Sequence, residues 1–157
     1  MTFCKRLRQN SKCLMLDAMP LSKNKVVAFA NIHDVAKAKD FYGGMLGLRL
    51  LSEEPPFALV YDANGTMIRL GMSKEPIQTG GTVLGWEVPD AATAVKELMA
   101  AGVIFERFGF MQQDDLGVWT TPTGAKVAWF KDPDGNMLSV SEHSEYPERK
   151  QWDREIK

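Results

Sequence analysis

The chain has 157 residues, of which 45% are hydrophobic and 10% aromatic, so it is long and apolar enough to build one domain with a substantial core. It contains 19 Lys and Arg against 20 Asp and Glu, which gives a formal net charge of −1. This balance excludes the basic excess by which proteins bind nucleic acid or anionic membranes through their overall charge. No apolar run approaches the length of a transmembrane helix. We expect a small organic molecule as the partner, and neither nucleic acid nor a membrane.

The two cysteines, Cys4 and Cys13, lie near the N-terminus at a spacing typical of neither zinc sites nor redox motifs. We interpret them as reduced thiols, which favours a cytoplasmic location. Residues 1–24 are rich in Lys and Arg, and the apolar run that begins at Cys13 is too short for a signal peptide. We predict that residues 1–24 are a disordered extension or reflect a start codon assigned too early, with Met19 as the alternative start. Residues 144–157 form a charged tail without a recognisable site.

A strand and a helix are predicted at the start of the folded region. Residues 25–31 are a short apolar run that suits a buried strand, and Asp34 stands where a helix N-cap belongs. Apolar residues then recur at three- and four-residue steps up to Gly47, which is placed to end the helix. The pair Gly43-Gly44 disfavours a regular helix there, at about 1 kcal/mol for each glycine relative to alanine.

Three strands are expected after this helix, over residues 48–52, 57–61 and 66–71. The last two are joined by Asn64-Gly65, which strongly favours a two-residue hairpin because both residues tolerate positive φ. The order of elements in residues 25–73 is therefore βαβββ.

The same order of signals recurs in the second half of the chain. Residues 82–88 have the pattern of a strand, Asp90 is a second candidate N-cap, and an amphipathic segment then ends at Gly102. Further strands are predicted near residues 103–107 and at 118–121, 125–130 and 137–141. The second half is thus a longer copy of the first.

The spacing of equivalent residues supports an internal duplication. Asp34 and Asp90 are 56 positions apart, whereas the glycines of the final hairpins, Gly65 and Gly135, are 70 positions apart. The difference predicts an insertion in the second copy, which we place around the sequence GFMQQDDLGVW. We therefore predict an α+β domain over residues 25–143, made of two βαβββ modules at about 25–73 and 81–143.

Two βαβββ units that each begin with a strand and an Asp-capped helix resemble the vicinal oxygen chelate superfamily. The first unit also contains FY…LGL, and the second ends in F-x-DPDGN-x-L. This superfamily includes glyoxalases, extradiol dioxygenases, fosfomycin-modifying enzymes and bleomycin-binding proteins. The resemblance covers residues 25–142 and implies two modules whose curved mixed sheets enclose one cleft. It specifies the fold and leaves the activity open, because the members share an architecture and differ in chemistry.

The resemblance also implies where a metal would bind. In metal-using members, up to four His, Glu or Gln side chains on the first and last strands of each module hold a divalent cation. Counting from the caps and hairpin glycines places these positions at Val27, Arg69, Val83 and Ser139. Glu87 cannot take the place of one of these positions as a metal ligand, because a shift by one residue turns a side chain to the opposite face of a strand. We predict no metal and no other cofactor, and expect a divalent metal only if these positions are misaligned.

Other catalytic arrangements find little support. His33 lies at the entry to the first helix and His143 at the end of the last strand, and nothing in the spacing brings them together. Ser139 and Ser141 lack a base placed by a motif, so neither is expected to be a nucleophile. No catalytic residue is predicted.

If the four positions face the cleft, they give it apolar walls, one guanidinium and one hydroxyl. Such a site suits a small, partly apolar ligand that carries a carboxylate or phosphate, because a guanidinium can grip either group at two points. Strand alternation adds residues to the same face, and exposed tryptophans add aromatic walls. The predicted ligand-binding residues are Arg69, Val27, Val83, Ser139, Glu87, Trp86, Phe29 and Met67. Trp119, Trp129, Phe57 and Phe130 are further aromatic residues that line the cleft or belong to the core.

Two interpretations of Arg69 stay open, and with them two functions. Arg69 contacts a ligand anion, or it forms an internal salt bridge with Glu87 that needs no ligand. The first function is a metal-independent protein that binds or sequesters a small molecule. The alternative is a metal-dependent enzyme of the glyoxalase or dioxygenase type. Dimerisation through exposed strand edges, giving a homodimer, is compatible with both.

The stretch WFKDPDGNMLSV, residues 129–140, contains two aspartates beside a glycine and invites comparison with a calcium loop. With Gly135 at position 6 of an EF-hand loop, Phe130 would occupy position 1, where an oxygen donor is required. We interpret the stretch as a hairpin instead, with Pro133 presetting the backbone and Asp134-Gly135 making the turn.

Overall fold

The computed structural model describes residues 21, 24–77 and 79–143. Of the predicted extension at residues 1–24, only residues 21 and 24 are described, and the predicted tail at 144–157 lies outside the described residues. None of the helices in the described part of the chain is long and apolar enough to cross a membrane.

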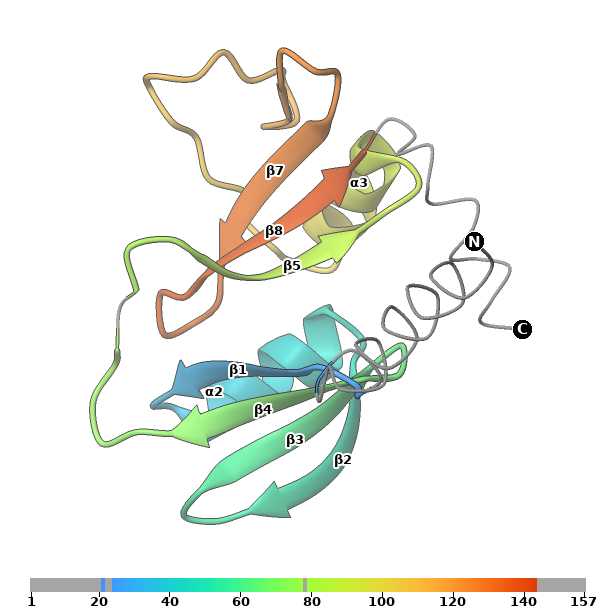
Figure 1. Cartoon of the computed structure of the whole chain (residues 1–157). Helices are drawn as coiled ribbons and strands as arrows, with labels where there is room; N and C mark the ends of the chain where they lie inside the picture. Colours follow the sequence, from blue (N-terminus) through green and yellow to red (C-terminus); the bar gives the residue numbers. More distant parts are fainter. Residues whose placement is uncertain (1–20, 22–23, 78, 144–157) are drawn as a thin grey trace, which may run out of the picture.

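Two modules with the same order of elements make up the fold (Figure 1). The first contains β1 (Val27–Ile32), α2 (Val35–Ala38), the π-helix η1 (Lys39–Met45), β2 (Arg49–Glu54), β3 (Ala58–Ala63) and β4 (Thr66–Met72). The second contains β5 (Thr82–Glu87), α3 (Ala91–Ala100), β6 (Trp119–Thr120), β7 (Lys126–Lys131) and β8 (Met137–Glu142). The predicted α+β duplication is confirmed.

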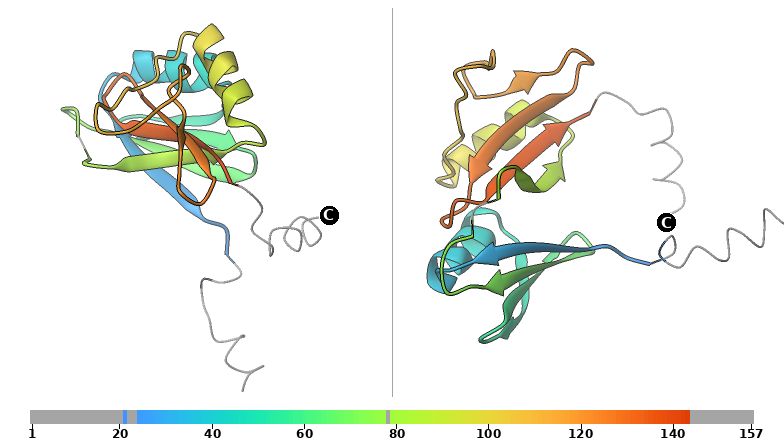
Figure 2. Two further views of the ribbon diagram at one scale, coloured as in Figure 1. Left: turned by 90° about the horizontal axis from the view of Figure 1, so that it is seen from above. Right: turned by 60° about the vertical axis from the view of Figure 1, so that its left-hand side comes forward.

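Each module forms a four-stranded mixed sheet, in the orders β1-β4-β3-β2 and β5-β8-β7-β6. The first strand of each sheet pairs in parallel with the last, and the other neighbours are antiparallel. The two sheets do not close on each other; β1 and β5, an edge strand of each, lie side by side and in contact. Seen from above, both helical segments lie on the same side of the sheets (Figure 2).

The first helix departs from a regular α-helix where the glycine pair was expected to weaken it. Asp34 caps it as predicted, since its Oδ1 accepts a hydrogen bond of 3.0 Å from the Lys37 N–H. After one α-helical turn the segment widens into a π-helix, in which the Leu46 N–H donates to the Phe41 carbonyl at 2.9 Å. Gly47 ends it with φ of +69°, a conformation that favours glycine.

Residues 103–107 do not form a continuous strand, so the prediction of a strand there is wrong. Only Phe105 forms an isolated bridge, to Phe130, and the Glu106 N–H donates to the Trp129 carbonyl at 2.7 Å. The next piece of the same edge is β6, which pairs with the start of β7. The insertion between residues 107 and 118 therefore divides this edge strand into two short pieces. The equivalent edge strand of the first module, β2, is continuous.

The insertion is folded on itself around one side chain. Gln113 accepts a hydrogen bond from the Phe108 N–H at 2.7 Å and donates to the carbonyls of Glu106 and Gly117 at 3.2 and 2.7 Å. These bonds satisfy backbone groups that a split strand leaves without ladder partners. The loop thereby holds Phe108 beside the sheet, against Trp129.

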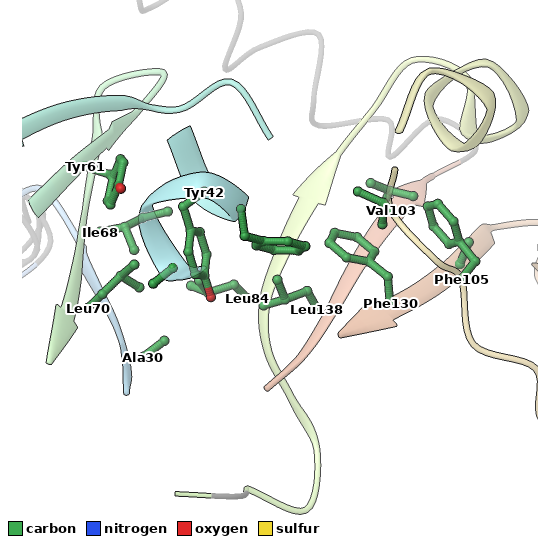
Figure 3. Close-up of a cluster of buried hydrophobic side chains, with 14 of the residues drawn as sticks. Ala30, Tyr42, Tyr61, Ile68, Leu70, Leu84, Val103, Phe105, Phe130 and Leu138 are labelled. Carbon is green, nitrogen blue, oxygen red and sulfur yellow. The ribbon is translucent and has the colours of Figure 1, made fainter. Parts of the chain in front are cut away.

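One apolar core serves both modules. Its buried members form a single cluster that includes residues of both sheets and of the helical segments. In Figure 3 the side chains run from Ile68 and Leu70 of β4, past Tyr42, to Leu138 and Phe130 of the second module. Because the core crosses the module boundary, neither module buries its apolar face alone.

The DPDGN hairpin between β7 and β8 turns as predicted, and it also joins the two modules. Asp132 and Asn136 are buried, and the Asp132 Oδ1 accepts from the N–H groups of Asp134 and Asn136 at 3.0 and 2.8 Å. The other carboxylate oxygen accepts from the Asn136 side chain at 2.7 Å and from the Tyr42 hydroxyl at 2.8 Å. Tyr42 belongs to the first module, so this hydrogen bond crosses the boundary.

Further hydrogen bonds cross the boundary at the same corner, including a long one of 3.5 Å from the Asp34 N–H to the Asp134 Oδ1. The Asn136 Nδ2 donates to the Asn31 carbonyl at 2.7 Å, and the Asp134 Oδ2 accepts from the His33 N–H at 2.9 Å. Each satisfies a backbone group at the end of β1 that has no ladder partner across the corner. The motif expected to be a turn is therefore also the polar contact that orients β1 against the second module.

We predict that Tyr42→Phe lowers the free energy of unfolding by about 1–3 kcal/mol, because a buried carboxylate oxygen loses a donor. Burial, reinforced by the Asp132 carboxylate, raises the pKa of Tyr42 well above its ordinary value of 10.0. The unfolded chain ionises this phenol near pH 10 and the folded chain does not, so stability falls as pH rises above about 10. The variant lacks this contribution and should lose stability less steeply there. Urea unfolding at pH 8 and pH 11 measures both effects.

Tyr61→Phe is the matched control at pH 8. Tyr61 is equally buried, but its hydroxyl makes no hydrogen bond to any described residue. Equal losses in the two variants at pH 8 would contradict the role assigned to the Tyr42–Asp132 bond.

Candidate functional site

The candidate site lies on the faces of the two sheets that point away from the helices. Along each strand, residues on this face alternate with residues whose side chains point into the core, as the strand registers show. We call this surface the open face. In the first module it comprises Val27, Phe29, Asn31, Arg49, Ser52, Glu54, Ala58, Val60, Asp62, Met67, Arg69 and Gly71; in the second, Thr82, Gly85, Glu87, Trp119, Val127, Trp129, Lys131, Met137, Ser139 and Ser141.

Four predicted ligand-binding residues lie together on the first module's open face. Val27 is the register partner of Met67, and Phe29 is the partner of Arg69. Phe29 is 66% exposed, and Val27 and Met67 are each 38% exposed. Adjacent apolar side chains this exposed, on the edge strand β1 and its neighbour β4, are typical of a surface that binds a partner or ligand.

Arg69 is paired within the protein, but with a residue that the sequence reasoning missed. Its Nη2 donates to the Glu54 Oε2 at 2.6 Å, and the Ser52 hydroxyl donates to the Glu54 Oε1 at 3.1 Å. The hydrogen bond from Arg69 holds the pKa of the Glu54 carboxyl below its usual value, with a smaller contribution from Ser52. Both side chains of the ion pair are about a third exposed, so the pair contributes little to stability.

Of the two interpretations of Arg69 left open by the sequence, one is excluded, because a salt bridge with Glu87 is not formed. Glu87 lies on β5, where its Oε1 is 3.4 Å from the His143 Nδ1, and Arg69 pairs within its own sheet. A β-bulge between Leu50 and Ser52 decides which face of β2 carries Glu54. No hydrophobic alternation in the sequence reveals that bulge.

Ser139 occupies the position of Arg69 in the second module. It is paired with Gly85 on one side and Trp129 on the other, just as Arg69 is paired with Phe29 and Val60. Ser139 is only 7% exposed, and its hydroxyl makes no hydrogen bond to any described residue.

Gly85 leaves space above this hydroxyl. A Cβ at residue 85 would lie 2.8 Å from the Ser139 Oγ, which is closer than Cβ atoms approach other atoms in proteins. The duplicated position in the first module carries the projecting ring of Phe29. The two halves of the open face therefore have the same backbone plan, with a projection in one and a hollow in the other.

Two predicted site residues do not lie on the open face. Val83 is the extra residue of a β-bulge between Thr82 and Leu84, and it packs against the core. Trp86 also faces the core, where its ring stacks on Phe130 with centroids 6.5 Å apart. The bulge interrupts the alternation of side chains along β5 at Val83. The prediction that Val83 faces the cleft assumed an unbroken alternation and is therefore wrong.

An aromatic group covers part of the second module's open face. The rings of Trp119 and Trp129 have centroids 6.1 Å apart, and Phe108 meets Trp129 edge-on at 5.6 Å. Phe110 continues the group beyond Phe108. Of the other two aromatic candidates, Phe130 belongs to the core, while Phe57 is exposed in the turn between β2 and β3. Phe108 and Phe110 were not predicted, because the insertion that carries them has no strand periodicity.

The residues present do not fit a divalent metal. Val27 and Arg69 lack donors for a cation, and the bulge places Thr82, not Val83, opposite Met137 on the open face. Among the described residues no three His, Cys, Asp or Glu side chains gather closely enough to hold a metal ion. Ser139 alone would be a weak ligand.

The chain matches known proteins along most of its length. The family model of the Glyoxalase/Bleomycin resistance protein/Dioxygenase superfamily matches residues 25–140. The chain therefore belongs to this superfamily, and the predicted resemblance is confirmed. No curated protein matches it significantly.

Solved structures of the superfamily share its fold. A lactoylglutathione lyase from Agrobacterium tumefaciens is 18% identical with a TM-score of 0.60, covering 78% of this chain and 95% of that one. A superfamily member from Sphaerobacter thermophilus is 25% identical with a TM-score of 0.57, covering 75% and 97%. One from Alicyclobacillus acidocaldarius is 17% identical with a TM-score of 0.59, covering 81% and 96%. Identities this low establish the architecture and leave the chemistry to the site.

We predict that Arg69→Met raises the pKa of Glu54 toward its ordinary value of 4.5, because the largest cause of its lowering is removed. Titration of the Glu54 side-chain carbon by NMR measures the change. Arg49→Met is the control, since Arg49 forms a similar ion pair with Asp62 and should leave Glu54 unchanged. A Glu54 pKa that does not move in Arg69→Met would show that the pair is absent in solution.

Proposed function

We propose that this protein binds a small, partly apolar organic molecule on its open face without a metal ion. The observation that carries the proposal is the side-chain chemistry of the positions where metal-using members are expected to place ligands. Val27 and Arg69 stand there beside Phe29 and Met67, all on one exposed surface. Apolar contact and one guanidinium are what a small organic anion needs for recognition.

The ion pair with Glu54 is compatible with this role. A guanidinium has five N–H donors, and of those on Arg69 only an Nη2 N–H is bonded to a described residue, the acceptor being Glu54. The remaining donors are available to a carboxylate or phosphate of the ligand. Glu54 also holds the Arg69 side chain in one orientation, which lowers the conformational entropy lost when a ligand binds.

A ligand bound here would contact Phe29 with its apolar part and Arg69 with its anionic part. The two residues are register partners on neighbouring strands, so the distance between the two parts is set by the sheet. This arrangement supports binding or sequestration of such a ligand.

We predict that the purified protein carries no stoichiometric Ni, Zn, Fe or Mn, and that EDTA leaves its melting temperature unchanged. A metal held at 100 times its dissociation constant would stabilise the fold by about 2.7 kcal/mol. Its removal would therefore lower the melting temperature by several degrees. Elemental analysis and thermal unfolding with and without chelator make the measurement. Stoichiometric metal with a lowered melting temperature would instead support a metal-dependent enzyme of the glyoxalase or dioxygenase type.

We predict that Arg69→Met weakens the binding of cyclohexanecarboxylate about tenfold or more, because a charge-assisted hydrogen bond is lost. Binding of the neutral cyclohexanecarboxamide should change little. Isothermal titration or ligand-observed NMR gives both affinities. Lys39→Met, at an exposed ion pair with Glu53 that lies away from the open face, is the matched control and should behave as wild type. Equal affinity of wild type and Arg69→Met for the carboxylate would remove Arg69 from the proposed role.

A further inference from the structure

We infer that the second module's open face is a subsite for a planar aromatic ring, with the Ser139 hydroxyl as the hydrogen-bond partner of a polar atom on that ring. This inference rests on the proposed function and narrows the ligand to an aromatic compound. Three features carry it: a hydroxyl on a largely buried side chain that has no partner in the described structure, a glycine that leaves space above it, and an aromatic wall beside it.

The hydroxyl is the first feature. Ser139 is 7% exposed and its Oγ makes no hydrogen bond to any described residue. The side chain is largely buried but its Oγ still reaches solvent, so a polar ligand atom can take the place of water at this hydroxyl. The neighbouring residues on β8, Leu138 and Val140, point into the core, which places the Ser139 side chain on the open face.

The space above the hydroxyl is the second feature. Gly85 is exposed and is the register partner of Ser139, and any Cβ at residue 85 would collide with the Oγ at 2.8 Å. Gly85 does not have positive φ, so its backbone conformation does not require glycine. The absence of a side chain is therefore explained by the close approach above Ser139 and not by backbone geometry.

The aromatic wall is the third feature. Trp129 lies beside Ser139 on β7, and its indole N–H donates to the Thr82 hydroxyl at 3.2 Å, which fixes the ring orientation. A cavity of about 360 Å³ opens beside Trp129 and is also lined by Phe108, Phe110, Lys131 and Met137; Ser139 is not part of this lining and adjoins it through its register partner Trp129. Such a volume accommodates one or two fused rings, and aromatic rings favour planar partners through stacked or edge-on contact.

The two halves of the open face then have complementary roles. The first module has Arg69 for an anionic group, and the second has Ser139 and Trp129 for a ring. The edge strands β1 and β5 lie in contact where the two modules meet, so one ligand can span both halves of the open face. The ligand class that fits both halves is a planar aromatic acid with a hydrogen-bonding atom on its ring.

The test uses 2-naphthol, a neutral planar probe that can bind the second module without Arg69. On titration of the ¹⁵N-labelled full-length protein, we expect the Gly85 amide and the Trp129 indole N–H resonances to shift. Ser139→Ala should weaken binding about three- to tenfold, the range of one lost hydrogen bond. Trp129→Leu should weaken it about two- to tenfold, the range of one aromatic contact.

Ser141→Ala is the matched control, because Ser141 lies two residues further along the same face of β8 and should behave as wild type. Gly85→Ala should abolish binding by filling the hollow. Should Gly85→Ala fail to fold, Ser139→Ala still decides, since it only removes an atom. No shift at Gly85 and Trp129, or equal affinities in wild type and Ser139→Ala, would overturn the inference. The proposed function stands or falls separately, on the Arg69-dependent binding of cyclohexanecarboxylate.

Discussion

The buried carboxylate of Asp132 is the interaction on which the arrangement of the two modules depends. It accepts four hydrogen bonds, three from its own hairpin and one from the Tyr42 hydroxyl of the first module. Leaving water is costly for a carboxylate, and it is tolerated here because every bond is short and directed. Asn136 and Asp134 add bonds to the end of β1. A turn between two strands thus fixes how β1 meets the second module, and with it the relation between the two halves of the open face.

The duplicated backbone explains why the two halves can differ so much. Core positions such as Leu70 and Leu138 must fill a shared interior, so both modules keep large apolar residues there. Open-face positions carry no such constraint. The row that holds Phe29 and Arg69 in one module therefore holds Gly85 and Ser139 in the other. Membership of the superfamily accounts for the backbone arrangement that the two modules share, while the side chains at these positions determine the chemistry.

The charge on the open face is more balanced than one exposed arginine would suggest. Glu54 neutralises Arg69 locally and fixes its direction, so recognition of an anion would depend on geometry as much as on attraction over distance. The insertion of the second module contributes differently. By splitting the edge strand and folding around Gln113, it carries Phe108 to the ring of Trp129. A local change in chain length thereby alters the apolar character of one half of the surface.

The sequence by itself determined the duplication, both aspartate caps, the glycine that ends the first helix and the hairpin turns. Each of these follows from contacts within a few residues or from a periodic pattern, and such signals are complete in the chain. It also placed Val27, Phe29, Met67 and Arg69 on one face, because alternation is unbroken in β1 and β4. Only the tertiary structure decided the partner of Arg69 and the displacement of Val83, since both depend on β-bulges. A bulge changes the face of every later residue in its strand, and the strand's own sequence does not record which partner residues it meets.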